Sequence, residues 1–362
     1  MNKADSVALS EGLTGAGYDE AAGLEEADLL ILNTCSVRQA AEDKVYGLSD
    51  KVSSIKKSGR LSRIILTGCL AGSALGERKR IGLEKLKIDL PWVDEFLPLA
   101  ELKKEFPKEK KSVGSADKLP TQAEAFVSIS EGCDNFCSYC VVPYARGPEH
   151  SRPLEEIIEE VKCLVAGGVR EITLLGQNVN SYGKDHRIKS KLPPLRRVAV
   201  GGDKNPFARL LVELNEIEGL EKIKFLTSNP WDLTDDIIEA MKLPKIERYL
   251  HLPIQSGDDE VLRRMNRHYT VSEYKDLVAK IRRQIPDIRL GTDIIVGFPG
   301  ETEGQFENTA QLCRAIKFNV VYAAKYSARP GTAAAKFLDD VSAAEKKRRY
   351  ARLMAVVKKF QG

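Results

Sequence analysis

The sequence predicts an α/β protein in which an amino-terminal α/β domain precedes a partial (β/α)6 barrel. From Phe126 onward, short β-rich segments alternate with amphipathic helical patterns, as in βα units around a parallel sheet. Six such repeats in about 200 residues are too few to close an eight-stranded barrel, so an open partial barrel is expected and a doubly wound open sheet is the alternative. The 362 residues, 43% hydrophobic and 30% charged, suffice for two packed domains.

The expected barrel strands lead into polar residues. These strands read AFVSIS (125–130), EITLLG (171–176), KIKFLTS (222–228), RYLHLPI (248–254), RLGTDIIVGF (289–298) and VVYAAKYS (320–327). After the first strand, apolar residues over 154–168 recur at helical spacing before a Gly-Gly stop, which predicts a helix. Reactive groups in such folds gather just past the carboxyl ends of the strands, and we expect the functional site there.

The domain organisation follows from shifts in composition. Residues 1–118 are expected to form the amino-terminal domain, 119–340 the barrel, and 341–362 a basic carboxyl-terminal helix. The charged, proline-containing stretch 102–120 is the expected linker. The segment 4–18 reads as a helix ending in glycines with no strand before it, so the first strand of this domain is expected to be missing.

Two cysteines follow the predicted strands of the amino-terminal domain. Strand 27–35 runs into Cys35, strand 63–69 runs into Cys69, and a helix beginning near Val37 lies between them. Because parallel strands end at the same edge of a sheet, both thiols should lie close enough to share a ligand.

The remaining composition narrows the class of protein. Seven cysteines, an odd number, in a chain without a secretory signal or an apolar run of about 20 residues favour a cytoplasmic protein with reduced thiols. The net charge of +4 permits binding to a polyanion without requiring it. The segment 183–205 is strongly basic, and is either a solvated insertion or a phosphate-contacting loop.

Three thiols are crowded into the segment 130–147. Cys133, Cys137 and Cys140 have the spacing Cys-x3-Cys-x2-Cys, which suits three irons of a [4Fe–4S] cubane and leaves the fourth iron without a protein ligand. That open position is where a substrate or cofactor can bind. A structural zinc site would need a fourth ligand, for which His150 is the nearest candidate, and inert buried thiols are the third possibility.

This motif, with Tyr139 just before the last cysteine, resembles the signature of the radical S-adenosylmethionine superfamily. The resemblance implies that Cys133, Cys137 and Cys140 hold the catalytic cluster and that S-adenosylmethionine chelates its open iron. One electron from the cluster would then cleave the cofactor to a 5′-deoxyadenosyl radical.

Motifs along nearly the whole chain resemble the methylthiotransferases of that superfamily, in particular those that act on tRNA. They read NTCSVR (33–38), TGC (67–69), GCDNFCSYCVVPYARGPEHSRP (132–153), GVREITLLGQNVNSYG (168–183), LPIQSGDDEVLRRMNRHYT (252–270) and DIIVGFPGETE (293–303). The resemblance implies methylthiolation at C2 of N6-isopentenyladenosine beside the tRNA anticodon, with one S-adenosylmethionine giving the methyl group and another the radical. Threonylcarbamoyladenosine in tRNA and a ribosomal-protein aspartate stay open as substrates. A non-catalytic iron–sulfur RNA-binding protein is the alternative of another class.

The resemblance also implies a second [4Fe–4S] cluster, held by Cys35 and Cys69, that presents the sulfur. The family uses three cysteines there, the first in a segment resembling GCQMN, whereas this chain opens MNKADS. We therefore expect weak or no occupancy of that site. The basic helix also stops where the family continues into a TRAM domain that grips RNA, so weak, salt-sensitive tRNA binding is expected.

Polar residues at the strand ends are candidate contacts for the cofactor. They are Tyr139, Gln177, Asn178, Ser228, Gln255, Asp293 and Gly297. The polar side chains among them either hydrogen-bond the methionine and ribose parts of S-adenosylmethionine or merely cap strand ends. Gly297 and Gly300 either allow close approach of the adenine or form a structural bend.

Four other residues have less specific roles. Arg146 either neutralises a carboxylate or phosphate or forms a surface ion pair, and Arg329 is placed to meet RNA or cofactor. Cys163 and Cys313 are expected to be inert core residues on apolar helix faces. The implied partners are tRNA, an electron donor such as flavodoxin or ferredoxin, and an unidentified sulfur source. We expect a monomer with no membrane association.

Overall fold

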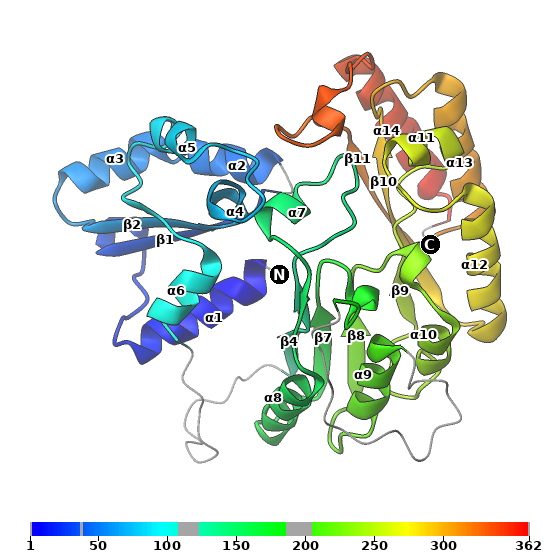
Figure 1. The fold of residues 1–362 in the computed structure, drawn as a ribbon, viewed down its shortest axis with the longest axis horizontal. Coiled ribbons are helices and arrows are strands. Elements are labelled where there is room, and N and C mark those ends of the chain that lie inside the picture. Colours follow the sequence, from blue (N-terminus) through cyan, green and yellow to red (C-terminus); the bar gives the residue numbers. More distant parts are fainter. Residues whose placement is uncertain (1, 37–38, 108–122, 186–204, 361–362) are drawn as a thin grey trace.

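The computed structural model describes residues 2–36, 39–107, 123–185 and 205–360, which form two lobes side by side (Figure 1). The amino-terminal lobe contains a parallel sheet in the order β1-β2-β3, with bounds Leu29–Thr34, Arg63–Gly68 and Glu95–Phe96. One face of this sheet packs on α1 (Asn2–Gly15) and α6 (Leu99–Glu105). The other face packs on α2 (Gln39–Tyr46), α3 (Ser49–Lys57), α4 (Cys69–Leu75) and α5 (Leu83–Asp89).

The expected helix over 4–18 and both expected strands of this lobe are present, with three differences. The helix near Val37 is two helices, α2 and α3, separated by Gly47 and Leu48. The short strand β3 was not foreseen. The linker begins later than predicted, because α6 continues to Glu105 and Phe106 is 6% exposed in the core beneath it. Most of the expected linker lies outside the described residues.

The second lobe is the partial barrel that the repeats predicted. Its parallel strands, neighbours in chain order, are β4 (Glu124–Ser128), β7 (Glu171–Leu175), β8 (Lys222–Phe225), β9 (Tyr249–His251), β10 (Arg289–Val296) and β11 (Val320–Lys325). A parallel bridge between Ile223 and Ile246 links the β4-β7-β8 sheet to the β9-β10-β11 sheet. Helices cover the outside: α8 (Leu154–Ala166), α9 (Pro206–Asn215), α10 (Asp235–Ala240), α11 (Asp259–Arg264), α12 (Val271–Gln284), α13 (Glu303–Ile316) and α14 (Ala343–Val357).

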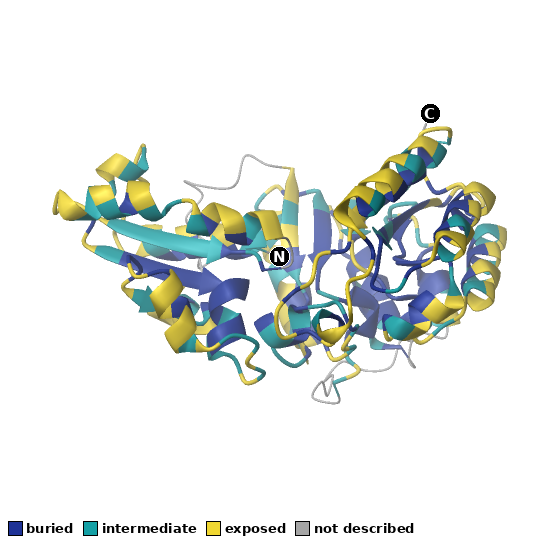
Figure 2. Ribbon diagram, turned by 90° about the horizontal axis from the view of Figure 1, so that it is seen from above, coloured by how far each residue is buried: buried dark blue, intermediate teal, exposed yellow. Residues whose placement is uncertain are grey.

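The barrel strands bury one face and leave the other open. In β10, Leu290 and Ile294 point to the helices and are at most 1% exposed, whereas Asp293 lies on the opposite face. The same alternation buries Val321 of β11 and leaves Tyr322 59% exposed. Figure 2 shows the buried strands between helices whose outer sides are exposed. We call the strand face turned away from the helices the inner face.

The basic carboxyl-terminal helix is confirmed as α14, but three of its arginines form ion pairs within the protein. They pair with carboxylates in and next to α13: Arg348 with Glu303, Arg349 with Glu301, and Arg352 with Glu307. Arginines held in this way are less able to neutralise RNA phosphates. In the part of the chain that the structure describes, no helix is both long enough and apolar enough to cross a bilayer.

Candidate functional site

A short ladder closes the loop that carries the three clustered cysteines. β5 (Ser130–Glu131) pairs antiparallel with β6 (His150–Ser151) just beyond the carboxyl end of β4. Gly132 has φ of +82°, and a Cβ atom there would lie 2.0 Å from the carbonyl oxygen of Pro148. Only glycine allows so close an approach, so this position holds the two ends of the cysteine loop together.

The cysteine loop is also held by segments that follow β9 and β11. The backbone N–H of Ser138 donates to the carbonyl of Met265 at 3.0 Å, and its own carbonyl accepts from the N–H of Ala334 at 2.7 Å. The N–H of Cys140 donates to the carbonyl of Cys137 at 2.9 Å, which places both cysteines on one tight turn. The loop is therefore shaped by the protein before any ligand binds.

The three thiols share one electrostatic environment. Cys133 is 9% exposed, and Cys137 and Cys140 are half-buried. Burial, with a smaller contribution from the neighbouring Cys137, raises the pKa values of Cys133 and Cys140 to about 12. Three mutually repelling sulfurs in a poorly solvated loop suit cationic ligands that would take up their negative charge on deprotonation.

A cubane and a single metal ion require different spacings of the thiolates that bind them. Among the described residues, no group of three or more His, Cys, Asp or Glu side chains could hold one metal ion. Thiolates sharing one zinc ion would stand about 3.8 Å apart, given a Zn–S distance of about 2.3 Å. Each thiolate of a cubane binds a different iron, so these sulfurs must be spread farther apart.

A buried arginine contacts the cysteine loop from the segment after α11. Arg267 is 7% exposed, and its Nη1 donates to the Sγ of Cys137 at 3.4 Å. Its Nη2 donates to the carbonyl of Pro253 at 2.9 Å, and its guanidinium lies 4.6 Å from the ring centroid of Trp231. A fixed cation at this distance offsets negative charge gathered at the cysteine loop. The sequence analysis missed Arg267, and its position in the MNRHYT segment was the available signal.

Several buried polar atoms at the carboxyl ends of β4, β7 and β8 lack a hydrogen-bond partner among the described residues. They are the Oγ atoms of Ser130 and Ser228, Oε1 of Gln177 and Oδ1 of Asn178. Unpaired buried polar atoms are rare and cost about 1–3 kcal/mol each, so this edge has the character of a site for a polar ligand. The carboxylate, amine and hydroxyl groups of S-adenosylmethionine fit that requirement. Ser130 was not among the predicted contacts, although it ends the first predicted strand.

Asn178 is also tied to an acidic cavity beside the cysteine loop. Its Nδ2 donates to Oδ2 of Asp232 at 2.6 Å, and Asp232 lines a cavity of about 200 Å³ together with Asp134 and Glu149. Burial raises the pKa of Glu149 to about 7. Asn178 is thus oriented by the protein through its amide nitrogen, and its carbonyl oxygen is left for a ligand.

Tyr139 and Gln255 occupy unusual surroundings. Tyr139 is partly buried against the apolar cluster that contains Met265 and Phe298, and burial raises the pKa of its hydroxyl well above the usual value. Gln255 has φ of +71°, a conformation that side chains rarely adopt, and its backbone bonds on both sides to β10. Backbone strain of the kind seen at Gln255 is found at ligand sites. Contact with the cofactor stays a prediction for both Tyr139 and Gln255.

Asp293 and Gly297 have partners within the protein. A carboxylate oxygen of Asp293 lies 3.1 Å from Nε2 of His251, on the inner face of the barrel. Gly297 has φ of +68°, and a Cβ atom there would lie 2.4 Å from Cγ of Lys346. The packing of Lys346 therefore supplies a structural reason for this glycine, and its approach to the adenine stays a prediction.

The cysteines of the amino-terminal lobe lie at one sheet edge, as the parallel strands predicted. Thr34 pairs with Gly68 across β1 and β2, so Cys35 and Cys69 follow adjacent strand ends. Cys35 lines a cavity of about 450 Å³. Cys69 is 3% exposed at the start of α4. Two thiolates would leave two irons of a cubane without protein sulfur. Weak or no occupancy by a cluster stays the prediction for this site.

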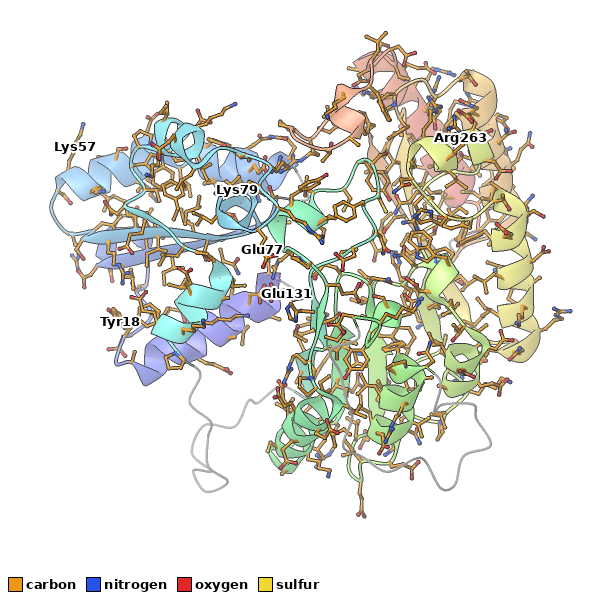
Figure 3. All side chains as sticks on the ribbon, viewed as in Figure 1. Tyr18, Lys57, Glu77, Lys79, Glu131 and Arg263 are labelled. Carbon is orange, nitrogen blue, oxygen red and sulfur yellow. The ribbon has the colours of Figure 1, made fainter. Side chains whose placement is uncertain are left out.

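Arg146 joins the two cysteine sites. Its side chain is 4% exposed, and its Nε donates to the Sγ of Cys69 at 3.3 Å. The guanidinium also donates to Asn2, Asp5 and Glu131 at 2.7–2.8 Å, and Figure 3 labels Glu131 where the lobes meet. Burial alone would lower the pKa of Arg146, but the attraction of the Cys69 sulfur and of the Asp5 and Glu131 carboxylates raises it above the usual value. The arginine of the cysteine loop is therefore a buried cation at the other thiol site, and not a surface ion pair.

The helices beside these cysteines are in direct backbone contact. α4 begins at Cys69, and α7 (Val142–Ala145) follows Cys140. Gly72 of α4 is so close to α7 that a Cβ atom would lie 2.1 Å from the carbonyl oxygen of Ala145. Packing at backbone distance sets the spacing between the two thiol sites.

Changing Gly72 to alanine is expected to push α4 away from α7. The atom that the new methyl group meets belongs to the backbone and cannot rotate away. Overpacking of this kind costs about 1–3 kcal/mol, so the urea midpoint of unfolding should fall. Gly82→Ala is the control, because no atom lies within 4 Å of a Cβ there. Equal midpoints for the two variants would contradict this contact.

Arg329 faces the amino-terminal lobe and not the solvent. It is 5% exposed, and its Nη2 lies 2.7 Å from Oε1 of Glu42, which Arg80 also contacts at 3.4 Å. Arg329 donates further to the side chain of Gln39 and the carbonyl of Ser36. This arginine therefore locks the segment after Cys35 to the end of the barrel, and the prediction that it meets RNA is not supported by its position.

The structure tests the expectation that Cys163 and Cys313 are core residues. Cys313 is buried in the barrel core, but Cys163 is exposed on α8, so its assignment to the core is wrong. α8 buries Leu154, Ile157 and Val161, and Cys163 projects from the opposite side. Residues 186–204, most of the basic segment, lie outside the described residues.

Solved structures share this fold at low sequence identity. The radical S-adenosylmethionine methyltransferase TsrM from Kitasatospora setae aligns with a TM-score of 0.55 at 12% identity, covering 89% of this chain and 70% of that one. The cobalamin-dependent S-adenosylmethionine radical enzyme OxsB gives a TM-score of 0.54 at 12% identity, covering 99% of this chain and 54% of that one. These likenesses show the fold alone.

Closer relatives cover nearly the whole chain. The tRNA-2-methylthio-N(6)-dimethylallyladenosine synthases of Clostridium botulinum (strain Okra / Type B1) and Roseobacter denitrificans are 43% and 40% identical over 99% and 100% of this chain, and over 79% and 81% of their own lengths. Residues 127–313 match the Radical SAM superfamily, and residues 1–87 match Uncharacterized protein family UPF0004. The chain therefore belongs to the radical S-adenosylmethionine superfamily, and within it to the family of tRNA-2-methylthio-N(6)-dimethylallyladenosine synthases.

Proposed function

We propose that this protein transfers a methylthio group to C2 of N6-dimethylallyladenosine beside the anticodon of tRNA. One observation carries the proposal. Three clustered thiols and several unpartnered buried polar atoms lie together at the carboxyl ends of the barrel strands. The identity of 43% to synthases of this name supports the choice of substrate.

The chain's own residues would prepare the site for this reaction. Cys133, Cys137 and Cys140 would bind three irons of a [4Fe–4S] cluster and leave one open for S-adenosylmethionine. When bound, the [4Fe–4S] cluster and S-adenosylmethionine would supply the radical that removes the C2 hydrogen, and a second cluster at Cys35 and Cys69 would supply the sulfur. The unpartnered atoms of the strand ends would orient the methionine part of the cofactor by hydrogen bonds.

The buried arginines would tune and align the two thiol sites. Arg267 donates to Cys137 and would offset the negative charge of the cluster. Arg146 belongs to the cysteine loop but donates to Cys69, so it would keep the sulfur-presenting site turned toward the radical site. We infer that the protein acts as a cytoplasmic monomer and takes electrons from a donor such as flavodoxin or ferredoxin.

The proposal is tested by nucleoside analysis. tRNA from a host that lacks its own synthase is treated with the anaerobically reconstituted chain, S-adenosylmethionine and a reductant. 5′-Deoxyadenosine is the expected product of the barrel site, and 2-methylthio-N6-dimethylallyladenosine is expected only to the extent that Cys35 and Cys69 hold the second cluster. Methylthiolation of threonylcarbamoyladenosine instead would identify that nucleoside as the substrate. Absence of 5′-deoxyadenosine would favour a non-catalytic iron–sulfur protein.

Replacing Arg267 with methionine is expected to make the reduction potential of the barrel cluster more negative. Loss of the N–H···S bond removes a positive charge and a hydrogen bond from Cys137, both of which stabilise the reduced cluster. Spectroelectrochemical titration measures the potential, and 5′-deoxyadenosine formation should slow with it. Arg263→Met is the matched control, since that side chain is 73% exposed and pairs with Glu260. A potential unchanged in Arg267→Met would contradict the tuning role.

A further inference from the structure

The inner face of the barrel carries a continuous strip of side chains from β8 to β11. The strip consists of Leu226, Tyr249, His251, Asp293 and Tyr322. The bridge between Ile223 and Ile246 places Leu226, three residues on, level with Tyr249. The registers of β9, β10 and β11 then lead to His251, opposite Gly291, and to Asp293, opposite Tyr322.

The two ends of this strip are exposed and apolar. Leu226, which directly follows β8, is 41% exposed and Tyr322 is 59% exposed, although Phe225 and Val321, the residues before them, are buried. The ring of Tyr322 lies 5.6 Å from the ring of His251, at an interplanar angle of 57°. Solvated aromatic and aliphatic side chains on a concave strand face are typical of a surface that stacks on a base.

The centre of the strip is polar and held in place. His251 is 7% exposed between Oδ2 of Asp293, at 3.1 Å from Nε2, and the hydroxyl of Tyr249, at 3.4 Å from Nδ1. Gly291 makes room for this arrangement, because a Cβ atom there would lie 2.1 Å from the Tyr249 hydroxyl oxygen. One carboxylate oxygen of Asp293 serves His251, and the Asp293 side chain is still 40% exposed.

Charges on the inner face disfavour an anion. Lys222 and Lys224, the lysines of β8 on this face, both pair with Glu171, and Lys224 also pairs with Glu124. Arg289, whose guanidinium lies 5.9 Å from the Tyr249 ring centroid, pairs with Glu247 at 3.4 Å. At the centre of the strip the carboxylate of Asp293 is exposed. An anionic substituent would meet repulsion here, whereas a neutral apolar one would gain contact with Leu226 and Tyr322.

We propose that this strip is the specificity site for the modified base: Tyr322 stacks on the adenine, and Leu226 with the aromatic rings contacts the apolar N6-dimethylallyl group. The inference rests on the proposed function and adds the residues that select its substrate. It also accounts for discrimination against threonylcarbamoyladenosine, whose N6 substituent carries a carboxylate that Asp293 repels.

The test measures binding and not turnover. Anticodon stem-loop RNAs that carry N6-dimethylallyladenosine, N6-threonylcarbamoyladenosine or adenosine are titrated against the anaerobically reconstituted full chain at one fixed salt concentration. We expect the dimethylallyl RNA to bind about tenfold more tightly than the adenosine RNA, and Tyr322→Ala to remove most of that preference. Tyr322→Phe should retain it, because the stacking ring is kept. Asp293→Asn should improve binding of the threonylcarbamoyl RNA.

Control variants separate this inference from the proposed function. Tyr350→Ala, on a 36% exposed tyrosine of α14, should leave all three affinities unchanged. If the unaltered chain prefers the dimethylallyl RNA and Tyr322→Ala keeps the full preference, the strip is not the specificity site, while the proposed function stands. If the unaltered chain shows no preference, this inference is overturned, and the nucleoside analysis decides independently whether the proposed reaction occurs.

Discussion

Replacing Cys140 with serine is expected to remove the barrel cluster and all reductive cleavage of S-adenosylmethionine. The cysteine loop offers three sulfurs, and a cubane that loses one of them has two irons without a protein thiolate. A hydroxyl is a far weaker ligand for iron than a thiolate, because it stays protonated at neutral pH. Iron content, the visible absorption of the cluster and 5′-deoxyadenosine formation should all fall to the level of protein without a cluster.

The control for this variant is another cysteine of the same lobe. Cys163 is exposed on α8, away from the loop, and Cys163→Ser should leave iron content and cofactor cleavage unchanged. Equal losses in both variants would indicate general damage from cysteine replacement. A Cys140→Ser protein that retains a full cluster and cleaves S-adenosylmethionine would refute the assignment of the cysteine loop as the radical site.

Changing Glu42 to alanine is expected to lower the free energy of unfolding of the amino-terminal lobe by about 3–5 kcal/mol. Glu42 is 6% exposed and is the carboxylate shared by Arg80 and Arg329, whose side chains are 1% and 5% exposed. Without it, two buried guanidinium groups face each other with no counter-charge. Because Arg329 comes from the barrel, the attachment between the lobes should weaken as well. Urea denaturation followed by circular dichroism measures the loss.

An exposed glutamate supplies the comparison for Glu42. The side chain of Glu84 is 81% exposed and pairs with Lys87 on the surface of α5. Glu84→Ala should change the free energy of unfolding by less than about 0.5 kcal/mol, since exposed ion pairs contribute little. Similar small losses for the two variants would mean that the shared carboxylate does not hold the lobes together.

The barrel and its radical site were predictable because their signals are local. Each strand appears as a short β-rich run, and the three cysteines of the loop stand within eight positions of one another. The parallel order of strands then places their carboxyl ends, and so Gln177 and Ser228, at one edge without further information. Cys163 was misplaced for a related reason: helical spacing alone did not decide which side of α8 its thiol would take.

Side-chain contacts between residues far apart in the chain were beyond such reasoning. Arg267 donates to Cys137 from 130 positions away, and Arg329 contacts the loop after Cys35 across nearly the whole chain. A guanidinium carries the same charge on a surface as in a buried pair, so composition and spacing give no sign of its partner. The same holds for the strip ending at Tyr322, which exists only because β8, β9, β10 and β11 lie side by side.

The sequence by itself determined the α/β class, the six barrel strands, the spacing of the three thiols and the family. Periodicity and clustered cysteines can be recognised because they involve residues that are close together in the chain. Only the tertiary structure decided which charges meet the thiols, how the lobes are locked and which side chains line the inner face. Those features depend on burial and on distances of a few ångströms between residues that the chain keeps far apart. They arise only once packing of the core has fixed the backbone.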